Sequence, residues 1–197
     1  MRKYDAVFFD LDGTLSESGE GILWCVRRTI EDLKIVVPEN FRLESFIGPP
    51  LADSFYRLGL DDEKVKLGVK TYKSYYDTKG KYMNKAYDGI KELLERLREK
   101  GYKLGVATSK YELFARQIID NIGLLQYFDF VSGATANAER QKKIDVLNYG
   151  IKNLGATPEN SALIGDTKFD AEGARLCGCG FVGVLYGYGT RKEMEAE

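Results

Sequence analysis

The apolar residues of this chain follow two alternating patterns between residue 87 and residue 184. Short apolar runs predict strands, and segments in which apolar residues recur at helical spacing between charged ones predict amphipathic helices. The predicted strands span residues 103–107, 128–131, 162–164 and 181–184, with an earlier one at residues 6–9. The predicted helices run from Ile90 to just before Gly101 and over residues 111–122, 143–154 and 171–176.

This alternation of strands and helices predicts an α/β fold. Strands separated by helices pair in parallel, so we expect a Rossmann-like, doubly wound parallel sheet with helices on both faces. In a sheet of this kind, the ligand crevice lies beyond the carboxyl ends of the strands.

The strand and helix alternation stops between Leu15 and about Asn84. This stretch has a mostly helical pattern, in which Ile22, Val26 and Ile30 share one face. We therefore expect a small helical bundle, inserted into the sheet domain and standing over the crevice as a lid.

The chain is predicted to hold two domains. Residues 1–15 and 85–197 form the α/β core domain, and residues 16–84 form an inserted α-helical cap domain. Two loop-like segments near residues 16–20 and 82–86, rich in small or polar residues, are predicted to be the hinges of the cap.

The charge of the chain is nearly balanced. Its 197 residues carry 29 basic and 30 acidic side chains, for a formal net charge of −1. This balance gives no general electrostatic reason for binding nucleic acid or an anionic membrane. The N-terminus has no signal-peptide pattern, and no apolar run approaches the ~18 residues of a membrane span. We expect a cytoplasmic protein that acts on a small molecule, with a monomer as the default and a dimer left open.

The chain contains no histidine. Ser-His-Asp and Cys-His catalysis and imidazole-ligated zinc sites are therefore excluded. Proton transfer must use carboxylates, lysine, tyrosine or water. Cys177 and Cys179 flank a glycine in an apolar stretch, and with no further soft ligands nearby they are expected to be free, buried thiols.

Two carboxylates follow the first predicted strand. Asp10 and Asp12 lie one residue apart where residues 6–9 run into a turn at Gly13. Like charges so close repel strongly in a low dielectric, so one must be neutralised by a cation or hold a proton. Taken alone, the motif also fits an ordinary strand followed by an Asx-type turn.

Polar residues follow two more of the predicted strands. Thr108 and Ser109 come after the strand at 103–107, and Asp166 and Asp170 come after the strand at 162–164. Because the carboxyl ends of parallel strands share one edge of the sheet, these residues should converge with Asp10 and Asp12. A purely structural explanation does not predict this convergence, and we interpret it as an active site.

The chain resembles the haloacid dehalogenase-like phosphatases over nearly its whole length. Within them it is similar to the phosphoglycolate phosphatase-like group, which has a helical cap after the first strand. Residues 10–15 match the first motif of the family, Thr108 the second, Lys143 the third, and Gly165-Asp166 with Asp170 the fourth. Residues 166–170 and 183–190 also resemble a subgroup labelled either phosphoglycolate phosphatase or 5'-nucleotidase.

The third motif is the least regular. Lys142 and Lys143 are adjacent, and Ile144 replaces the proline often found after the lysine of the family. Val146 and Leu147 are the first inward residues of the following helix, which favours Lys143. Lys110 and Lys168, also close to motif positions, are interpreted as ordinary solvated lysines, with enrichment of the site in positive charge as the alternative.

The resemblance implies a role for each motif residue. Asp10 would be the nucleophile that forms an aspartyl-phosphate, and Asp12 the acid that protonates the leaving alcohol and then activates water. Thr108 through its hydroxyl and Ser109 through its amide would bind the phosphate, while Lys143 would hold it and offset the charge of Asp10.

Hard oxygen ligands in a chain without histidine indicate Mg2+ as the cofactor. Its expected ligands are the Asp10 carboxylate, the Asp12 backbone carbonyl and Asp166, together with water and the substrate phosphate. Asp170 is a supporting residue that either joins this shell through water or orients Lys143. Asp166 and Asp170 also fit a helix N-cap with an acid in its first turn.

The predicted activity is hydrolysis of a small phosphate ester, resembling phosphoglycolate or a nucleoside monophosphate. One alternative is a phosphomutase acting on a sugar phosphate, because the aspartyl-phosphate step is shared and only the acceptor differs. Another is a non-catalytic phosphate-binding scaffold. A P-loop kinase or NTPase is disfavoured because the sequence has no G-x-x-x-x-G-K-[ST] motif.

Overall fold

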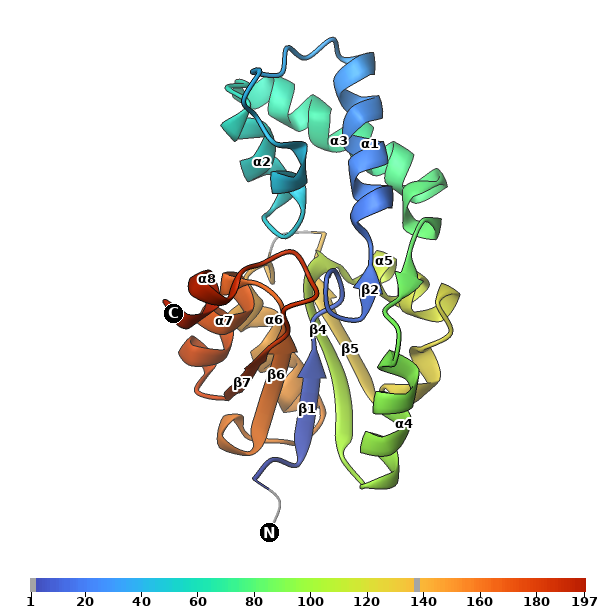
Figure 1. Ribbon diagram of the computed structural model, residues 1–197, viewed down its shortest axis with the longest axis vertical. Coiled ribbons are helices and arrows are strands. Elements are labelled where there is room, and N and C mark those ends of the chain that lie inside the picture. The colour runs from blue at the N-terminus through green and yellow to red at the C-terminus, as the bar shows by residue number, and fades with distance from the viewer. Residues whose placement is uncertain (1–2, 137–138) are drawn as a thin grey trace. The chain divides into compact units, whose positions relative to one another are not determined.

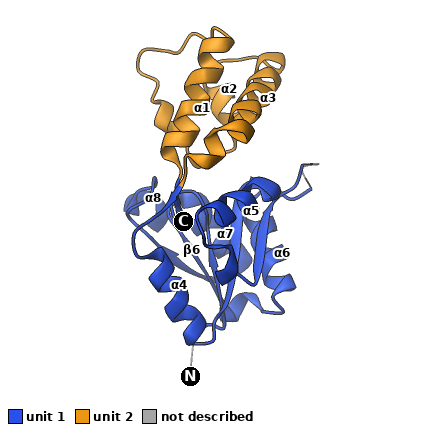
Figure 2. Cartoon of the chain, turned by 90° about the vertical axis from the view of Figure 1, so that its right-hand side faces the viewer, with its two compact units in different colours: residues 1–17, 85–197 blue, residues 18–84 orange. Residues whose placement is uncertain are grey.

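The computed structural model describes residues 3–136 and 139–197. The chain divides into two compact units, coloured separately in Figure 2. The first unit contains residues 1–17 and 85–197, and the second contains residues 18–84.

The first unit is built on a five-stranded parallel sheet (Figure 1). The strands run in the order β5-β4-β1-β6-β7. They are β1 (Ala6–Phe9), β4 (Lys103–Tyr111), β5 (Phe130–Ala134), β6 (Ser161–Gly165) and β7 (Gly180–Gly183). The chain winds outward from β1 in one direction through β4 and β5, and then in the other through β6 and β7. The predicted α/β fold with a doubly wound parallel sheet is confirmed.

Helices cover both faces of this sheet, and Figure 2 shows α4 and α6 on opposite sides of it. The crossover helices are α4 (Ile90–Glu99), α5 (Glu112–Asn121), α6 (Lys143–Asn153) and α7 (Lys168–Cys177). The unit also contains shorter helical pieces: η3 (Leu125–Tyr127), η4 (Pro158–Asn160) and α8 (Arg191–Glu195).

Phe8 lies at the centre of the core between the sheet and α6. Its side chain is fully buried, and two glycines allow it to sit there. A Cβ atom at Gly105 of β4 would lie 2.4 Å from the Phe8 ring, and one at Gly150 of α6 would lie 2.7 Å from it. The helix can therefore approach the sheet closely only because both positions lack a side chain.

Several elements of the first unit differ from their predicted bounds: β5, for example, spans Phe130–Ala134 instead of residues 128–131. Strand β4 continues to Tyr111 because its pairing with β5 shifts register between Ala107 and Tyr111, so Thr108 lies within the strand instead of after it. Helix α7 begins at Lys168, earlier than predicted, because Thr167 and Asp170 form a capping box at its N-terminus.

The cysteines of the first unit, Cys177 and Cys179, are free thiols, as predicted. Both are half-buried instead of fully buried, since they lie where α7 ends and the chain turns at Gly178.

The second unit is helical, as its sequence pattern predicts. It contains α1 (Gly19–Asp32), η1 (Leu43–Phe46), α2 (Leu51–Arg57), α3 (Asp62–Thr78) and η2 (Gly80–Tyr82). The ring of Trp24 in α1 packs edge-on against Tyr75 in α3, with the centroids 5.7 Å apart. Phe55 of α2 is fully buried against Gly68 of α3. These contacts give the unit an apolar core of its own.

The segments predicted to be loop-like hinges contain regular structure, which corrects that part of the prediction. Strand β2 (Ser16–Glu17) pairs antiparallel with β3 (Lys85–Ala86). The ribbon is closed by an ion pair between Lys85 Nζ and Glu17 Oε2 at 2.9 Å. Pairing between segments almost 70 residues apart leaves no local signature in the sequence, which explains the error.

None of the helices within residues 3–136 and 139–197 combines the length and apolar character that crossing a membrane requires.

Replacing Gly105 with alanine tests the close packing around Phe8. We expect Gly105→Ala to lower the free energy of unfolding by about 1–3 kcal/mol, because the new methyl group overlaps the Phe8 ring. Combining it with Phe8→Leu should cost less than the sum of the two single changes, since the smaller side chain relieves the overlap. Urea unfolding of the three variants measures this coupling, and strictly additive losses would show that the overlap is not the cause.

Candidate active site

The carboxyl ends of three neighbouring strands bring the predicted site residues together. Asp10 follows β1 and donates its backbone N–H to the Ile164 carbonyl of β6, at 2.9 Å. Asp166 follows β6, and Thr108 lies near the end of β4. All three residues are buried, with exposed fractions of 8% or less.

Lys143 connects this cluster through its ammonium group. Its Nζ lies 2.7 Å from Asp10 Oδ1 and 2.8 Å from Asp170 Oδ1, and it donates a hydrogen bond to the Ala107 carbonyl at 3.0 Å. Lys143 is the first residue of α6, and its side chain is 6% exposed. The neighbouring Lys142 is exposed, so the structure places Lys143, as the sequence favoured, in the cluster.

Three carboxylates share this buried space. Oxygen atoms of Asp10, Asp166 and Asp170 all lie within 4.8 Å of one another. Burial raises the pKa of Asp10, and the charges of Asp170 and Asp166 raise it further, while Lys143 opposes the shift. Burial also raises the pKa of Asp166, to about 6. When all three acids are ionised, the cluster carries more negative charge than one ammonium group can balance.

The pKa of Lys143 is also raised, which for a lysine favours the charged form. Burial by itself disfavours its charged form, but the nearby carboxylates of Asp10 and Asp170 outweigh burial and raise the pKa of this lysine. Lys143 therefore stays protonated, and the cluster keeps a fixed positive charge beside Asp10.

The acidic cluster fits a hard divalent cation. Mg2+ prefers carboxylate and other oxygen ligands, and a divalent ion would balance the charge that Lys143 leaves uncompensated. Asp10 and Asp166 are the predicted carboxylate ligands, and both belong to this cluster. Asp170 also belongs to it, but one of its oxygens forms the ion pair with Lys143.

Asp166 is held on both sides. Its Oδ1 accepts a hydrogen bond from the Thr14 hydroxyl at 3.0 Å, and its Oδ2 accepts one from the Tyr188 backbone N–H at 2.8 Å. The sequence did not indicate either hydrogen bond, because both Thr14 and Tyr188 are far from Asp166 along the chain.

Asp12 has an unforeseen partner. Its Oδ2 lies 2.9 Å from Lys110 Nζ, and the two side chains are 16% and 11% exposed. The favoured interpretation of Lys110 as a solvated lysine was therefore wrong, and the alternative, a positive charge at the site, applies to it. A signal existed, because Lys110 follows Thr108 by two residues at the end of the same strand. Asp12 Oδ1 is buried and has no hydrogen-bond partner among the described residues.

The remaining predicted residues differ in exposure. Thr108 is 2% exposed, and its hydroxyl accepts a hydrogen bond from the Lys110 backbone N–H at 3.2 Å. Ser109 is exposed, since successive residues of a strand point to opposite sides. Lys168, interpreted as solvated, is exposed.

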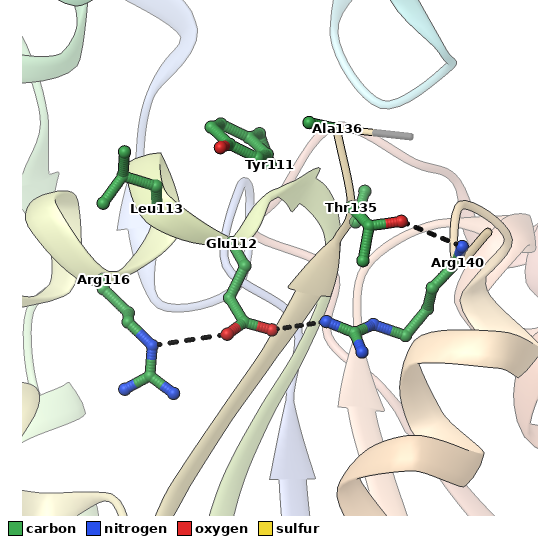
Figure 3. Close-up of a pocket in the computed structure, with 8 residues that line it drawn as sticks. Tyr111, Glu112, Leu113, Arg116, Thr135, Ala136 and Arg140 are labelled. Carbon is green, nitrogen blue, oxygen red and sulfur yellow. Dashed lines mark hydrogen bonds and ion pairs between the residues drawn. The ribbon is translucent and has the colours of Figure 1, made fainter. Parts of the chain in front are cut away.

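A pocket of about 350 Å³ lies beside the ends of β4 and β5 (Figure 3). Glu112 bridges its two arginines, with Oε2 2.6 Å from Arg140 Nη2 and Oε1 3.6 Å from Arg116 Nε. Arg140 Nε also donates to the Gly133 carbonyl at 2.8 Å. The charged groups of this pocket thus bind one another. They also fix Arg140, three residues before Lys143, against β5 and α5.

Comparisons with known proteins give a consistent result. The family model described as haloacid dehalogenase-like hydrolase matches residues 7–184. A Mycobacterium tuberculosis protein named tyrosine-protein kinase PtkA is 37% identical over 93% of this chain, which spans 62% of that relative's length. A Pseudomonas aeruginosa protein named 5'-nucleotidase is 36% identical, covering 98% of this chain and 88% of the relative. The crystal structure of a predicted phosphatase from Clostridium acetobutylicum has a TM-score of 0.91 at 36% identity, covering 99% of this chain and 91% of that one.

The buried acids predict how Mg2+ changes stability with pH. The raised pKa of Asp166 means that the metal-free fold favours its neutral form, so this stability is present below the unfolded pKa of about 3.9 and is lost as the pH rises to about 6. Mg2+ needs the ionised carboxylates, so we expect it to stabilise the protein more at pH 8 than at pH 5. At one hundred times its dissociation constant the gain at pH 8 should reach about 2.7 kcal/mol.

Urea unfolding with Mg2+ or with EDTA, at both pH values, measures this difference. Asp166→Asn is the control and should remove most of the gain. An equal effect of Mg2+ at pH 5 and pH 8 would contradict a site built on these acids.

Proposed function

The chain belongs to the haloacid dehalogenase-like hydrolases, and from this premise we propose that it is a Mg2+-dependent phosphomonoesterase. Its proposed substrate is a small phosphorylated metabolite, resembling phosphoglycolate or a nucleoside monophosphate. The observation that carries the proposal is the buried ion pair between Asp10 and Lys143, in one cluster with Asp166 and Asp170. The relative named 5'-nucleotidase supports the nucleotide form of the substrate.

Asp10 is the proposed nucleophile. One of its carboxylate oxygens would attack the phosphorus atom, the bond from phosphorus to the leaving oxygen would break, and an aspartyl-phosphate would remain. Attack requires the ionised carboxylate, although burial favours the neutral form. The Lys143 ammonium at 2.7 Å supplies part of the compensating charge.

Asp12 is the proposed acid and base. It would give a proton to the leaving alcohol oxygen and then take one from the water that cleaves the aspartyl-phosphate. Its position two residues after Asp10 in the chain supports this role. Lys110, at 2.9 Å, holds one carboxylate oxygen of Asp12, and the other has no hydrogen-bond partner among the described residues.

Thr108, Ser109 and Lys143 are the proposed phosphate-binding residues. The Thr108 hydroxyl and the Ser109 amide would donate hydrogen bonds to phosphate oxygens, and Lys143 would offset their charge. Asp170 is proposed as a positioning residue for Lys143, and their 2.8 Å ion pair supports this role.

Mg2+ would be held by the Asp10 carboxylate, the Asp12 backbone carbonyl and Asp166. It would supply Lewis-acid stabilisation of the charge on the phosphoryl oxygens. The excess negative charge of the buried acids supports the assignment. The second unit, within residues 16–84, is proposed to be the cap domain that selects the substrate.

Two alternatives are tested by the same assay. A phosphomutase would return the phosphoryl group to a sugar, and a non-catalytic scaffold would only bind phosphate. The relative named tyrosine-protein kinase adds a third outcome, transfer to a tyrosine hydroxyl. Steady release of inorganic phosphate from small phosphoesters, only with Mg2+, supports the hydrolase over all three. A screen across phosphoglycolate, nucleoside monophosphates and sugar phosphates then narrows the substrate class.

Asp10→Asn tests the nucleophile. We expect at least about a thousandfold loss of Mg2+-dependent hydrolysis of p-nitrophenyl phosphate, because the amide is a poor nucleophile. The fold should persist, since Lys143 keeps its ion pair with Asp170. Circular dichroism checks the fold, and Asp120→Asn on the exposed surface of α5 is the matched control. Retention of most activity by a folded Asp10→Asn protein would remove Asp10 from this role.

Asp12→Ala tests the acid. With an alkyl phosphate, whose leaving group needs a proton, we expect a loss of about 10²- to 10⁴-fold in the rate of phosphorylation of the enzyme. With p-nitrophenyl phosphate, the loss in that step should be clearly smaller, because nitrophenolate leaves without a proton. Pre-steady-state kinetics separate this step from hydrolysis of the aspartyl-phosphate. Equal losses for the two substrates would argue against the acid role.

A further inference from the structure

We propose that the segment between β7 and α8, residues 184–190, is a strap that positions Asp166 for metal binding. This inference rests on the proposed function, in which Asp166 is a ligand of Mg2+. The segment crosses the carboxyl ends of the central strands (Figure 1). We call it the C-terminal strap.

The strap supplies a hydrogen-bond donor directly to Asp166. The Tyr188 backbone N–H donates to Asp166 Oδ2 at 2.8 Å. Because the donor is a main-chain group, its position depends on the path of the strap and not on a side-chain rotamer. It therefore fixes the direction of the carboxylate.

The strap also contacts Thr14, the residue that supplies the second hydrogen bond to Asp166. The Tyr186 hydroxyl donates to the Thr14 carbonyl at 2.9 Å, and the Thr14 hydroxyl donates to Asp166 Oδ1 at 3.0 Å. The Tyr186 ring in turn packs against Tyr87, with the centroids 4.7 Å apart. Both oxygens of Asp166 are thus held by groups that the strap contacts.

Glycines allow the strap to pass this close. A Cβ atom at Gly187 would lie 2.3 Å from Asp166 Oδ2 and 2.4 Å from the Gly13 carbonyl oxygen. A Cβ atom at Gly189 would lie 2.1 Å from the Asp166 carbonyl oxygen. A Cβ atom does not approach non-bonded atoms this closely, so only glycine fits at either position without displacing its neighbours. Close packing against Asp166 therefore explains the two glycines of the strap.

Both ends of the strap are anchored. At its start, the Val184 N–H donates to the Gly165 carbonyl at 2.9 Å, directly before Asp166. At its end, Thr190 and Glu193 form a capping box that begins α8, and Met194 of that helix is buried. A segment fixed at both ends can hold a carboxylate at a set position, as groups behind a metal ligand do in other metal sites.

Gly187→Ala tests the strap. The added methyl group should displace the Asp166 carboxylate and raise the Mg2+ dissociation constant by about 10- to 100-fold, measured by isothermal titration calorimetry. Gly68→Ala is the matched control and should leave the constant unchanged, because its Cβ would meet Phe55 of the second unit instead of Asp166. The activity of Gly187→Ala should recover when Mg2+ is raised in proportion, which a general structural defect would not produce.

A second pair of variants covers the case in which Gly187→Ala does not fold. Tyr188→Pro removes the N–H that Asp166 accepts, whereas Tyr188→Ala keeps it, so the proline variant should weaken Mg2+ binding more. Circular dichroism and urea unfolding in EDTA identify the folded variants.

Asp166→Asn separates the strap from the proposed function. If Asp166→Asn loses Mg2+ affinity while folded Gly187→Ala and Tyr188→Pro keep the wild-type constant, the strap inference is overturned and the metal site stands. If Asp166→Asn itself binds Mg2+ as wild type does, the metal assignment fails, and the strap inference fails with it.

Discussion

The site depends on one buried ammonium group held between two carboxylates. Lys143 Nζ contacts Asp10 and Asp170 at 2.7 and 2.8 Å in a space that also contains Asp166. Removing the Lys143 charge would leave the carboxylates uncompensated in a low dielectric, which costs several kcal/mol. The ion pairs also join α6 and α7 to the end of β1. The contacts that balance charge in the site therefore also hold these two helices against the sheet.

Close backbone approaches make that arrangement geometrically feasible. Gly105 and Gly150 admit the Phe8 ring between β4 and α6, and α6 carries Lys143 at its first residue. A Cβ atom at Gly173 of α7 would lie 2.5 Å from Lys143 Cγ, so this glycine admits the stem of the lysine. The glycines are therefore part of how the charged groups reach one another.

Much of the fold and many of the candidate residues could be predicted from the sequence. The core strands are short apolar runs and the core helices have a 3.6-residue pattern, and Asp10, Thr108 and Asp166 were placed at the strand ends that they occupy or adjoin. The errors occurred where distant segments meet. The ribbon of Ser16 and Glu17 with Lys85 and Ala86 was expected to be loop, because its pairing has no local pattern.

The sequence by itself determined which chemical groups exist and in what order the strands present them: paired acids after β1, a hydroxyl on β4, a lysine opening α6, and acids after β6. It did so because periodicity and motif spacing are local properties of the chain. Only the tertiary structure decided the partners, such as Lys110 on Asp12 and the Tyr188 amide on Asp166. Burial and ion pairing depend on distances between residues remote in sequence, and those distances exist only after the chain has folded.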